Sequence, residues 1–291
     1  QKRVQLIIET GLIELKDDFK IYWKNFPIAK LVNGKDYLNP DIFLIVDDHS
    51  IAFSVKNIEK NTFVAFEYFE NTTDQNGWNQ LLGYLQNNSK LIQSYYRQVQ
   101  FVMNTKRTLL TKTVHAGADA FYHNEFSLVI GTKMEEELQL QKIGQDQVLV
   151  YSVPDALSTL LSRSFPTGKW IHYLSSLISS NQGDGVCITI FNDYFILLII
   201  QNGKPHFVNY FNKSGVDQNQ YLVLNACIQA NIQPKDTNLN VIGYSADRDL
   251  WLEALASYFA GTHMQQVPDE GIGAALNTDY PKHHYAPYFI F

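Results

Sequence analysis

Two blocks of the chain carry the same succession of short apolar runs, each bounded by polar turn residues. In the first block, the pattern predicts strands over residues 42–46, 50–55 and 62–69. Apolar residues at helical spacing then predict a helix that begins near Trp78, and a further strand follows over residues 99–103. The block therefore predicts three antiparallel strands, a helix and a fourth strand.

The second block repeats this order about half a chain later. Strands are predicted over residues 186–191, 195–200 and 205–211, and the pair Asn202-Gly203 is typical of a hairpin turn between the last two. The remaining elements are a helix, a strand and a helix, over residues 217–230, 239–242 and 247–260. One stripe of the first of these helices carries Tyr221, Leu224, Asn225 and Ile228.

The region between the blocks has a weaker pattern. It predicts a short helix over residues 115–123, a strand over residues 148–153 and a helix that starts at Pro154. An amphipathic helix is expected over residues 170–178. The acidic run at residues 135–137 is interpreted as a loop or a solvated helix face.

The two blocks align when Asp48 is set against Asp193, an offset of 145 residues. The apolar residues Ile51, Phe53 and Val55 then meet Ile196, Leu198 and Ile200. Such an internal repeat of the hydrophobic pattern indicates duplication of one supersecondary unit, and chance similarity between two hairpins is the alternative. The predicted fold class is α/β, with two mixed sheets that each start with three antiparallel strands and carry helices on their faces.

Length and composition fit two compact domains. The 291 residues exceed the usual length of one domain, and 45% of them are hydrophobic while only 18% are charged, which argues against a disordered chain. We predict a first domain over residues 38–183 and a second over residues 184–291. Residues 1–37 are predicted to form an N-terminal appendage.

Charge and cysteine content narrow the classes of function. The formal net charge of −6 disfavours a nucleic-acid partner. Cys187 and Cys227 both lie in apolar runs, so we interpret them as reduced core residues and exclude a disulfide scaffold and a cysteine-rich zinc site. No run reaches the length of a membrane span, and without a signal peptide we expect a cytoplasmic protein.

From residue 41 onward, the aligned blocks resemble an uncharacterised family of Bacteroidetes proteins, a domain of unknown function. Further residues that carry the resemblance lie at positions 150–154, 165–166, 170–172, 203–211, 221–230 and 239–243. Members of the family look like actin-fold proteins, and the pilus-assembly protein PilM is a distant relative of that fold. The resemblance implies a duplicated actin-like ATPase (RNase H-like) fold, and it implies no activity.

An actin-like fold holds a nucleotide through two turns of the form Asp-x-Gly and a Gly-Gly turn. Glycine is needed because backbone N–H groups must approach the phosphate closely. This chain has Asp47 and Asp48 without glycine at the first turn, Asp193 followed by Tyr194 at the second, and Gly243 alone at the third. By this resemblance, Asp47, Asp48, Asp193 and Gly243 are the residues of a degenerate nucleotide cleft.

Other candidate chemistry is weaker. Gly168-Lys169 lacks the remaining residues of a P-loop, and His283-His284 near the end of the chain are interpreted as surface imidazoles. We predict no catalytic residue and no metal site. The apolar C-terminal residues 285–291 are expected to dock on their own sheet as an edge strand, with contact to a partner as the alternative.

Two functional hypotheses follow. The first is a non-catalytic scaffold or regulatory protein without a cofactor, which binds a protein partner. The second is a divergent Mg-dependent ATPase or kinase, in which Asp47, Asp48 and Asp193 hold the metal of Mg-ATP.

Overall fold

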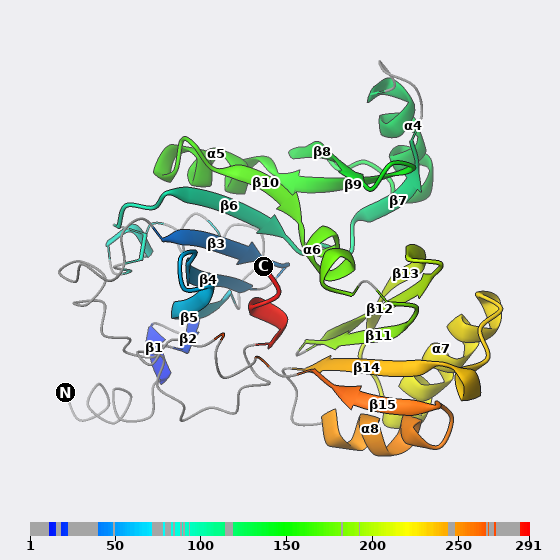
Figure 1. Cartoon of the computed structure of the whole chain (residues 1–291). Coiled ribbons are helices and arrows are strands. Elements are labelled where there is room, and N and C mark those ends of the chain that lie inside the picture. Colours follow the sequence, from blue (N-terminus) through cyan, green and yellow to red (C-terminus); the bar gives the residue numbers. More distant parts are fainter. Residues whose placement is uncertain are drawn as a thin grey trace. The chain divides into compact units, whose positions relative to one another are not determined.

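The chain folds into two compact units, shown in the computed structural model of Figure 1. The structure describes residues 12–15, 19–22, 40–48, 50–71, 94–113, 119–181, 183–191, 193–243, 248–265 and 286–291, with short pieces between 78 and 92 and positions 267 and 271. Unit 1 comprises Gln1–Tyr173 and Glu270–Asn277, and unit 2 comprises Leu174–Asp269 and Thr278–Phe291. The division at Tyr173 lies ten residues before the predicted one at 183.

Unit 1 is built on a seven-stranded mixed sheet with the order β1-β2-β5-β4-β3-β6-β10. Its strands are β1 (Leu12–Leu15), β2 (Phe19–Tyr22), β3 (Asp41–Val46), β4 (Ser50–Asn57), β5 (Thr62–Asn71), β6 (Gln98–Met103) and β10 (Lys169–His172). The strands β3, β6 and β10 are parallel to one another, and the other pairs are antiparallel. The predicted strands of the first block are confirmed.

Two parts of unit 1 differ from the sequence-based expectation. The strands β1 and β2 form a hairpin that pairs with β5, so part of the predicted appendage extends the sheet. The helix predicted over residues 170–178 is wrong at its start, because Lys169–His172 pair with β6 and only then does α6 (Tyr173–Ser180) begin. The ring of Trp170 lies 5.0 Å from that of Phe101 on β6, and this packing outweighs the local helical spacing.

A three-stranded antiparallel sheet with the order β7-β9-β8 also belongs to unit 1. Its strands are β7 (Thr108–Lys112), β8 (Glu136–Ile143) and β9 (Gln147–Pro154). In the sequence, the helix α4 (Asp119–Val129) lies between β7 and β8, and α5 (Asp155–Ser164) follows β9. Glu136 and Glu137 of the acidic run begin β8, and Glu135 lies in the turn before it. Glu136 accepts a 3.0 Å hydrogen bond from Arg107 Nε. Position 115 and its neighbours, where a helix was predicted to begin, lie outside the described residues.

Unit 2 is built on a five-stranded sheet with the order β13-β12-β11-β14-β15. Its elements are β11 (Gly185–Ile190), β12 (Tyr194–Gln201), β13 (Lys204–Asn212), α7 (Val216–Gln229), the 3₁₀ turn η2 (Pro234–Asp236), β14 (Asn238–Gly243), α8 (Arg248–Ala256), β15 (Gly261–Met264) and the 3₁₀ turn η5 (Ala286–Tyr288). Asn202 and Gly203 both have positive φ, 53° and 67°, as the predicted hairpin turn requires.

The two sheets share one plan, which confirms the predicted α/β class. Three antiparallel strands are followed by two parallel ones, β5-β4-β3-β6-β10 in unit 1 and β13-β12-β11-β14-β15 in unit 2. Val46 pairs with Ile51 and Ile190 with Phe195, so the hairpins correspond at an offset of 144 residues rather than 145. A slip of one residue exchanges the two faces of a strand. Ile51 therefore corresponds to Phe195, and both lie in the core.

The helix α7 turns a different side to the core from the stripe found in the sequence. Its buried residues are Asn219, Val223, Ala226 and Cys227. Of the sequence stripe, Tyr221 and Ile228 are 64% and 66% exposed. The buried side packs with Trp251 of α8 and the core residues of β11, β12 and β14, which places both helices on one face of the sheet.

The buried His172 at the end of β10 makes the stability of unit 1 depend on pH. Burial lowers the pKa of its imidazole to about 3, and its ring lies 4.8 Å from that of Tyr151. Below pH about 6.5 the unfolded chain takes up a proton at this residue while the folded chain does not. The stability that this residue contributes is therefore present near neutral pH and is lost as the pH falls.

We expect the free energy of unfolding of the wild-type chain to fall by about 2 kcal/mol more between pH 7.5 and pH 5 than that of His172→Gln. Urea unfolding at the two pH values measures this difference. Parallel pH profiles of the two proteins would contradict the prediction.

Candidate functional site

The β3–β4 turn of unit 1 carries Asp47 and Asp48. Asp47 Oδ1 accepts a 2.6 Å hydrogen bond from Ser50 N, and Asp47 Oδ2 accepts a 2.8 Å bond from Ser50 Oγ. Asp47 N in turn donates to Ser50 O at 3.0 Å. The carboxylate of Asp47 therefore closes its own turn, whereas Asp48 is exposed.

The β11–β12 turn of unit 2 has the same backbone closure and different side chains. Phe191 N donates to Tyr194 O at 2.9 Å, as Asp47 N does to Ser50 O. The rings of Phe191 and Tyr194 are stacked, with centroids 4.7 Å apart and an interplanar angle of 14°. Asp193 is exposed, and its backbone carbonyl accepts a 2.8 Å bond from Lys213 N. An aromatic pair thus stands where the other turn has a carboxylate and a hydroxyl.

The C-terminal segment of the chain covers this turn. The ring of Tyr288 meets that of Phe191 edge-on, with centroids 6.3 Å apart, and η5 lies against β14. Ala286, Tyr288 and Phe289 are buried. The predicted docking of the apolar tail on its own chain is confirmed, but the docked residues form a 3₁₀ turn instead of an edge strand.

Gly243 is the last residue of β14 and is buried. It pairs with Ile190, the last residue of β11, so it lies beside the turn that carries Asp193. Of the four residues proposed for a nucleotide cleft, Gly243 and Asp193 therefore lie near each other in unit 2, and Asp47 and Asp48 belong to unit 1.

Nucleophilic or metal chemistry has little support in the described part of the chain. Cys187 and Cys227 are free and buried, as predicted, and burial raises the pKa of their thiols to about 12 and about 11. Such thiols are poor nucleophiles at neutral pH. Among the described residues, no group of three or more His, Cys, Asp or Glu could hold a metal ion. His283 and His284 lie outside the described residues.

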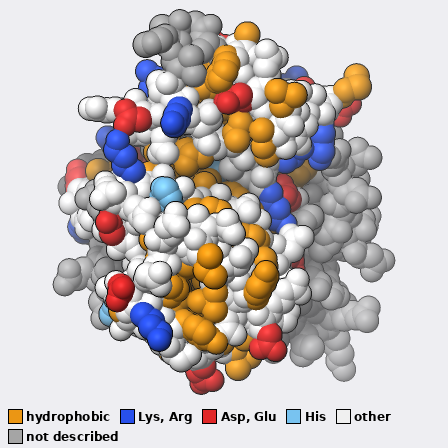
Figure 2. All heavy atoms as spheres, turned by 90° about the vertical axis from the view of Figure 1, so that its right-hand side faces the viewer, with side chains coloured by type: hydrophobic (Ala, Val, Ile, Leu, Met, Phe, Trp, Pro, Cys, Tyr) orange, Lys and Arg blue, Asp and Glu red, His pale blue; other side chains and the backbone are white. Residues whose placement is uncertain are grey.

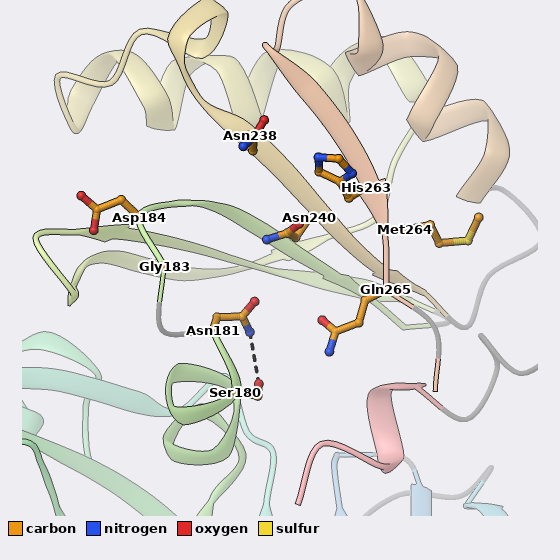
Figure 3. Close-up of a pocket in the computed structure, with 9 residues that line it drawn as sticks. All are labelled: Ser180, Asn181, Gly183, Asp184, Asn238, Asn240, His263, Met264 and Gln265. Atoms are coloured by element: carbon orange, nitrogen blue, oxygen red, sulfur yellow. Dashed lines mark hydrogen bonds between the residues drawn. The ribbon is translucent and has the colours of Figure 1, made fainter. Parts of the chain in front are cut away.

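Unit 2 also has a cavity of about 390 Å³ at the amino ends of β11 and β14 (Figure 3). The end of α6 and the residues before β11 border it on one side. Their polar groups are engaged: Asn181 Nδ2 donates to Leu177 O at 2.8 Å, and Asp184 Oδ1 accepts a 2.9 Å bond from Gly203 N. The bonds from the backbone of Gly203 and Asn202 lower the pKa of Asp184.

The strands β14 and β15 border the cavity on the other side, with Asn238, Asn240, His263 and Gln265. The side chains of these four residues make no hydrogen bond with any residue that the structure describes. These four residues were not predicted from the sequence, although asparagine at alternate positions before and after Leu239 places two amides on one face of a strand.

Comparisons with known proteins identify the fold. A family model described as "Protein of unknown function (DUF3822)" matches residues 39–261. A protein with actin-like ATPase fold and unknown function from Bacteroides thetaiotaomicron is 13% identical, with a TM-score of 0.66 over 84% of this chain and 96% of that one. The PilM-PilN type IV pilus biogenesis complex contains a chain that is 10% identical, with a TM-score of 0.55 over 86% and 95%. No curated protein matches.

The contacts of Asp47 predict a structural role that can be measured. We expect Asp47→Ala to lower the free energy of unfolding by about 1–2 kcal/mol, because it removes two hydrogen bonds to a carboxylate. Asp48→Ala serves as the matched control and is expected to change it by less than about 0.5 kcal/mol. Equal effects of the two substitutions in urea unfolding would show that Asp47 does not hold the turn.

Proposed function

Since this chain belongs to the family of proteins of unknown function whose model matches residues 39–261, and since it has an actin-like ATPase fold, we propose that it is a non-catalytic binding protein. In this proposal the nucleotide site is degenerate, and the fold serves as a scaffold or regulatory module that binds a protein partner.

The observation that carries the proposal is the aromatic filling of the β11–β12 turn. A phosphate-binding turn needs open backbone N–H groups and no bulky side chain in front of them. Here Phe191, Tyr194 and Tyr288 pack together at the turn, and Phe191 N is already bonded to Tyr194 O. In the other unit, both carboxylate oxygens of Asp47 are bonded to Ser50.

Exposed apolar side chains support a protein partner. The apolar surface of α7 is formed by Tyr221 and Ile228, which are 64% and 66% exposed. Figure 2 shows hydrophobic side chains at the surface of the described residues. In unit 1, Leu128 at the end of α4 and Met134 after it are 86% and 94% exposed. Large exposed apolar groups that cluster are typical of interaction surfaces. A similar chain, PilM, is found in a complex with PilN.

A second candidate is a divergent Mg-dependent ATPase or kinase. The exposed carboxylates of Asp48 and Asp193 favour it, because they lie on corresponding turns of the two units. In the described residues, no glycine stands in either turn to admit a phosphate group.

Thermal denaturation with magnesium-ATP separates the two candidates. We expect the melting temperature to stay unchanged with millimolar Mg-ATP, in the wild-type chain and in Asp193→Ala alike. A ligand at 100 times its dissociation constant would stabilise the fold by about 2.7 kcal/mol, which is readily detected. A rise in the wild-type melting temperature that disappears in Asp193→Ala would overturn the proposal in favour of the second candidate.

Capture of partners by the immobilised chain tests the binding role. We expect Ile228→Glu to lower the amount of a specifically captured protein at least tenfold, because it places a charge in the apolar surface of α7; tenfold corresponds to about 1.4 kcal/mol. Gln218→Glu, at another exposed position of α7, is the matched control. Leu128→Glu tests the surface of α4 in the same way. Identical capture by all four proteins would exclude both surfaces.

A further inference from the structure

The cavity beside β14 and β15 of unit 2 offers a set of unused hydrogen-bonding groups. We propose that it binds a small neutral ligand with several hydroxyl groups, of the size of a monosaccharide, through Asn238, Asn240, His263 and Gln265. This site is separate from the turns discussed above. It lies at the amino ends of β11 and β14, whereas Asp193 and Gly243 lie at their carboxyl ends.

The strand register brings the four side chains to one face of the sheet. Asn240 pairs with His263, and Asn238 pairs with Gly261, so the side chains of Asn238, Asn240 and His263 project to the same side. Gln265 follows His263 by two residues, and its N donates to Val241 O at 2.9 Å, which continues the pairing. Figure 3 shows these side chains on the sheet side of the cavity, across from Asn181 and Gly183.

Gly261 leaves space for the side chains of Asn238 and His263. A Cβ atom at Gly261 would lie 2.9 Å from Asn238 Oδ1 and 3.3 Å from His263 Nε2. The first distance is shorter than real Cβ contacts allow, so any other residue at position 261 would push the amide or the imidazole away. The absence of a side chain at Gly261 therefore lets a carbonyl oxygen and a ring nitrogen approach the same point.

The chemistry of the lining favours hydroxyl groups. Each primary amide offers donors and an acceptor, and each hydroxyl group of a ligand is likewise a donor and an acceptor, so the two match without any charge. Adjacent strands lie about 4.8 Å apart, and residues two positions apart on a strand are separated by about 6.6 Å. Amide and imidazole groups at such spacings reach several hydroxyl groups around one sugar ring.

Charged and apolar ligands fit less well. No Lys or Arg is among the described residues that line the cavity, so an anion would lack a counter-charge. Asp184 carries the one carboxylate among the lining residues that the structure describes, and it already accepts a hydrogen bond from Gly203 N, which leaves it less available to a cation. Met264 is the one large apolar side chain among the lining residues described, and it covers too little area for an apolar ligand.

The size of the cavity agrees with this ligand class. Its volume of about 390 Å³ lies near the lower end of the range of about 300–1,000 Å³ that is usual for small-molecule sites. A monosaccharide fills a substantial part of such a volume and leaves space for bridging water.

Saturation-transfer difference NMR on the full chain tests the proposal. The probes are glucose, galactose, mannose and N-acetylglucosamine at about 10 mM, with glucose 6-phosphate and glucosamine as charged counterparts. We expect saturation transfer to at least one neutral sugar, with a dissociation constant in the millimolar range or below, which corresponds to about −4 kcal/mol. Glucose 6-phosphate and glucosamine are each expected to bind at least tenfold more weakly than that neutral sugar.

Variants locate the site. Asn240→Ala, His263→Ala and Gly261→Ala are each expected to weaken binding at least tenfold. Gln218→Ala, which removes an exposed amide from α7, is expected to leave it unchanged, and circular dichroism with melting temperatures checks that each variant folds. The proposal is overturned if no neutral sugar receives saturation from the folded wild-type chain, if a charged sugar binds more tightly than its neutral parent, or if the three cavity variants bind as the wild type does. None of these results depends on the Mg-ATP experiment.

Discussion

Burial of β12 on both of its faces is the constraint on which unit 2 depends. Seven consecutive residues of this strand, 194–200, are buried, although only alternate ones belong to the core beneath α7 and α8. Two-sided burial removes a large apolar area from water, and it leaves no room for polar chemistry along the strand. The β11–β12 turn lies at one end of β12, and the cavity is bordered by β14 and β15 instead.

The β3–β4 turn of unit 1 and the β11–β12 turn of unit 2 have the same backbone closure and are stabilised by different side chains. Both are closed by a backbone hydrogen bond across four residues, between Asp47 and Ser50 in one and between Phe191 and Tyr194 in the other. The first uses a carboxylate to hold a serine, and the second uses stacked rings that the C-terminal segment covers. In both turns the backbone N–H of the first residue is already bonded, and in the first turn Ser50 N is bonded as well. The two turns thus share a backbone closure and differ in the side chains that pack or bond within it.

Most of the fold could be predicted from the sequence, because the strands around the turns are continuous apolar runs whose period is clear. The family resemblance then supplied the fold, since strand order is not encoded locally. The failures have physical causes. Residues 169–172 pair with β6 through long-range contacts that override helical spacing, and Tyr221 and Ile228 form a regular apolar stripe that faces outward. The cavity was missed because its groups come together only through the pairing of β14 with β15.

The chain enters unit 2 at Leu174, leaves it after Asp269 and returns at Thr278. A recombinant fragment that stops at Asp269 would therefore lack the ring of Tyr288 and expose Phe191 to water. Unit 2 consists of two separate segments of the amino-acid sequence. A fragment cut at a single position in the sequence therefore yields an incomplete unit. Any dissection of the chain has to supply its last residues together with the sheet that they cover, for example by a short linker that joins the two segments.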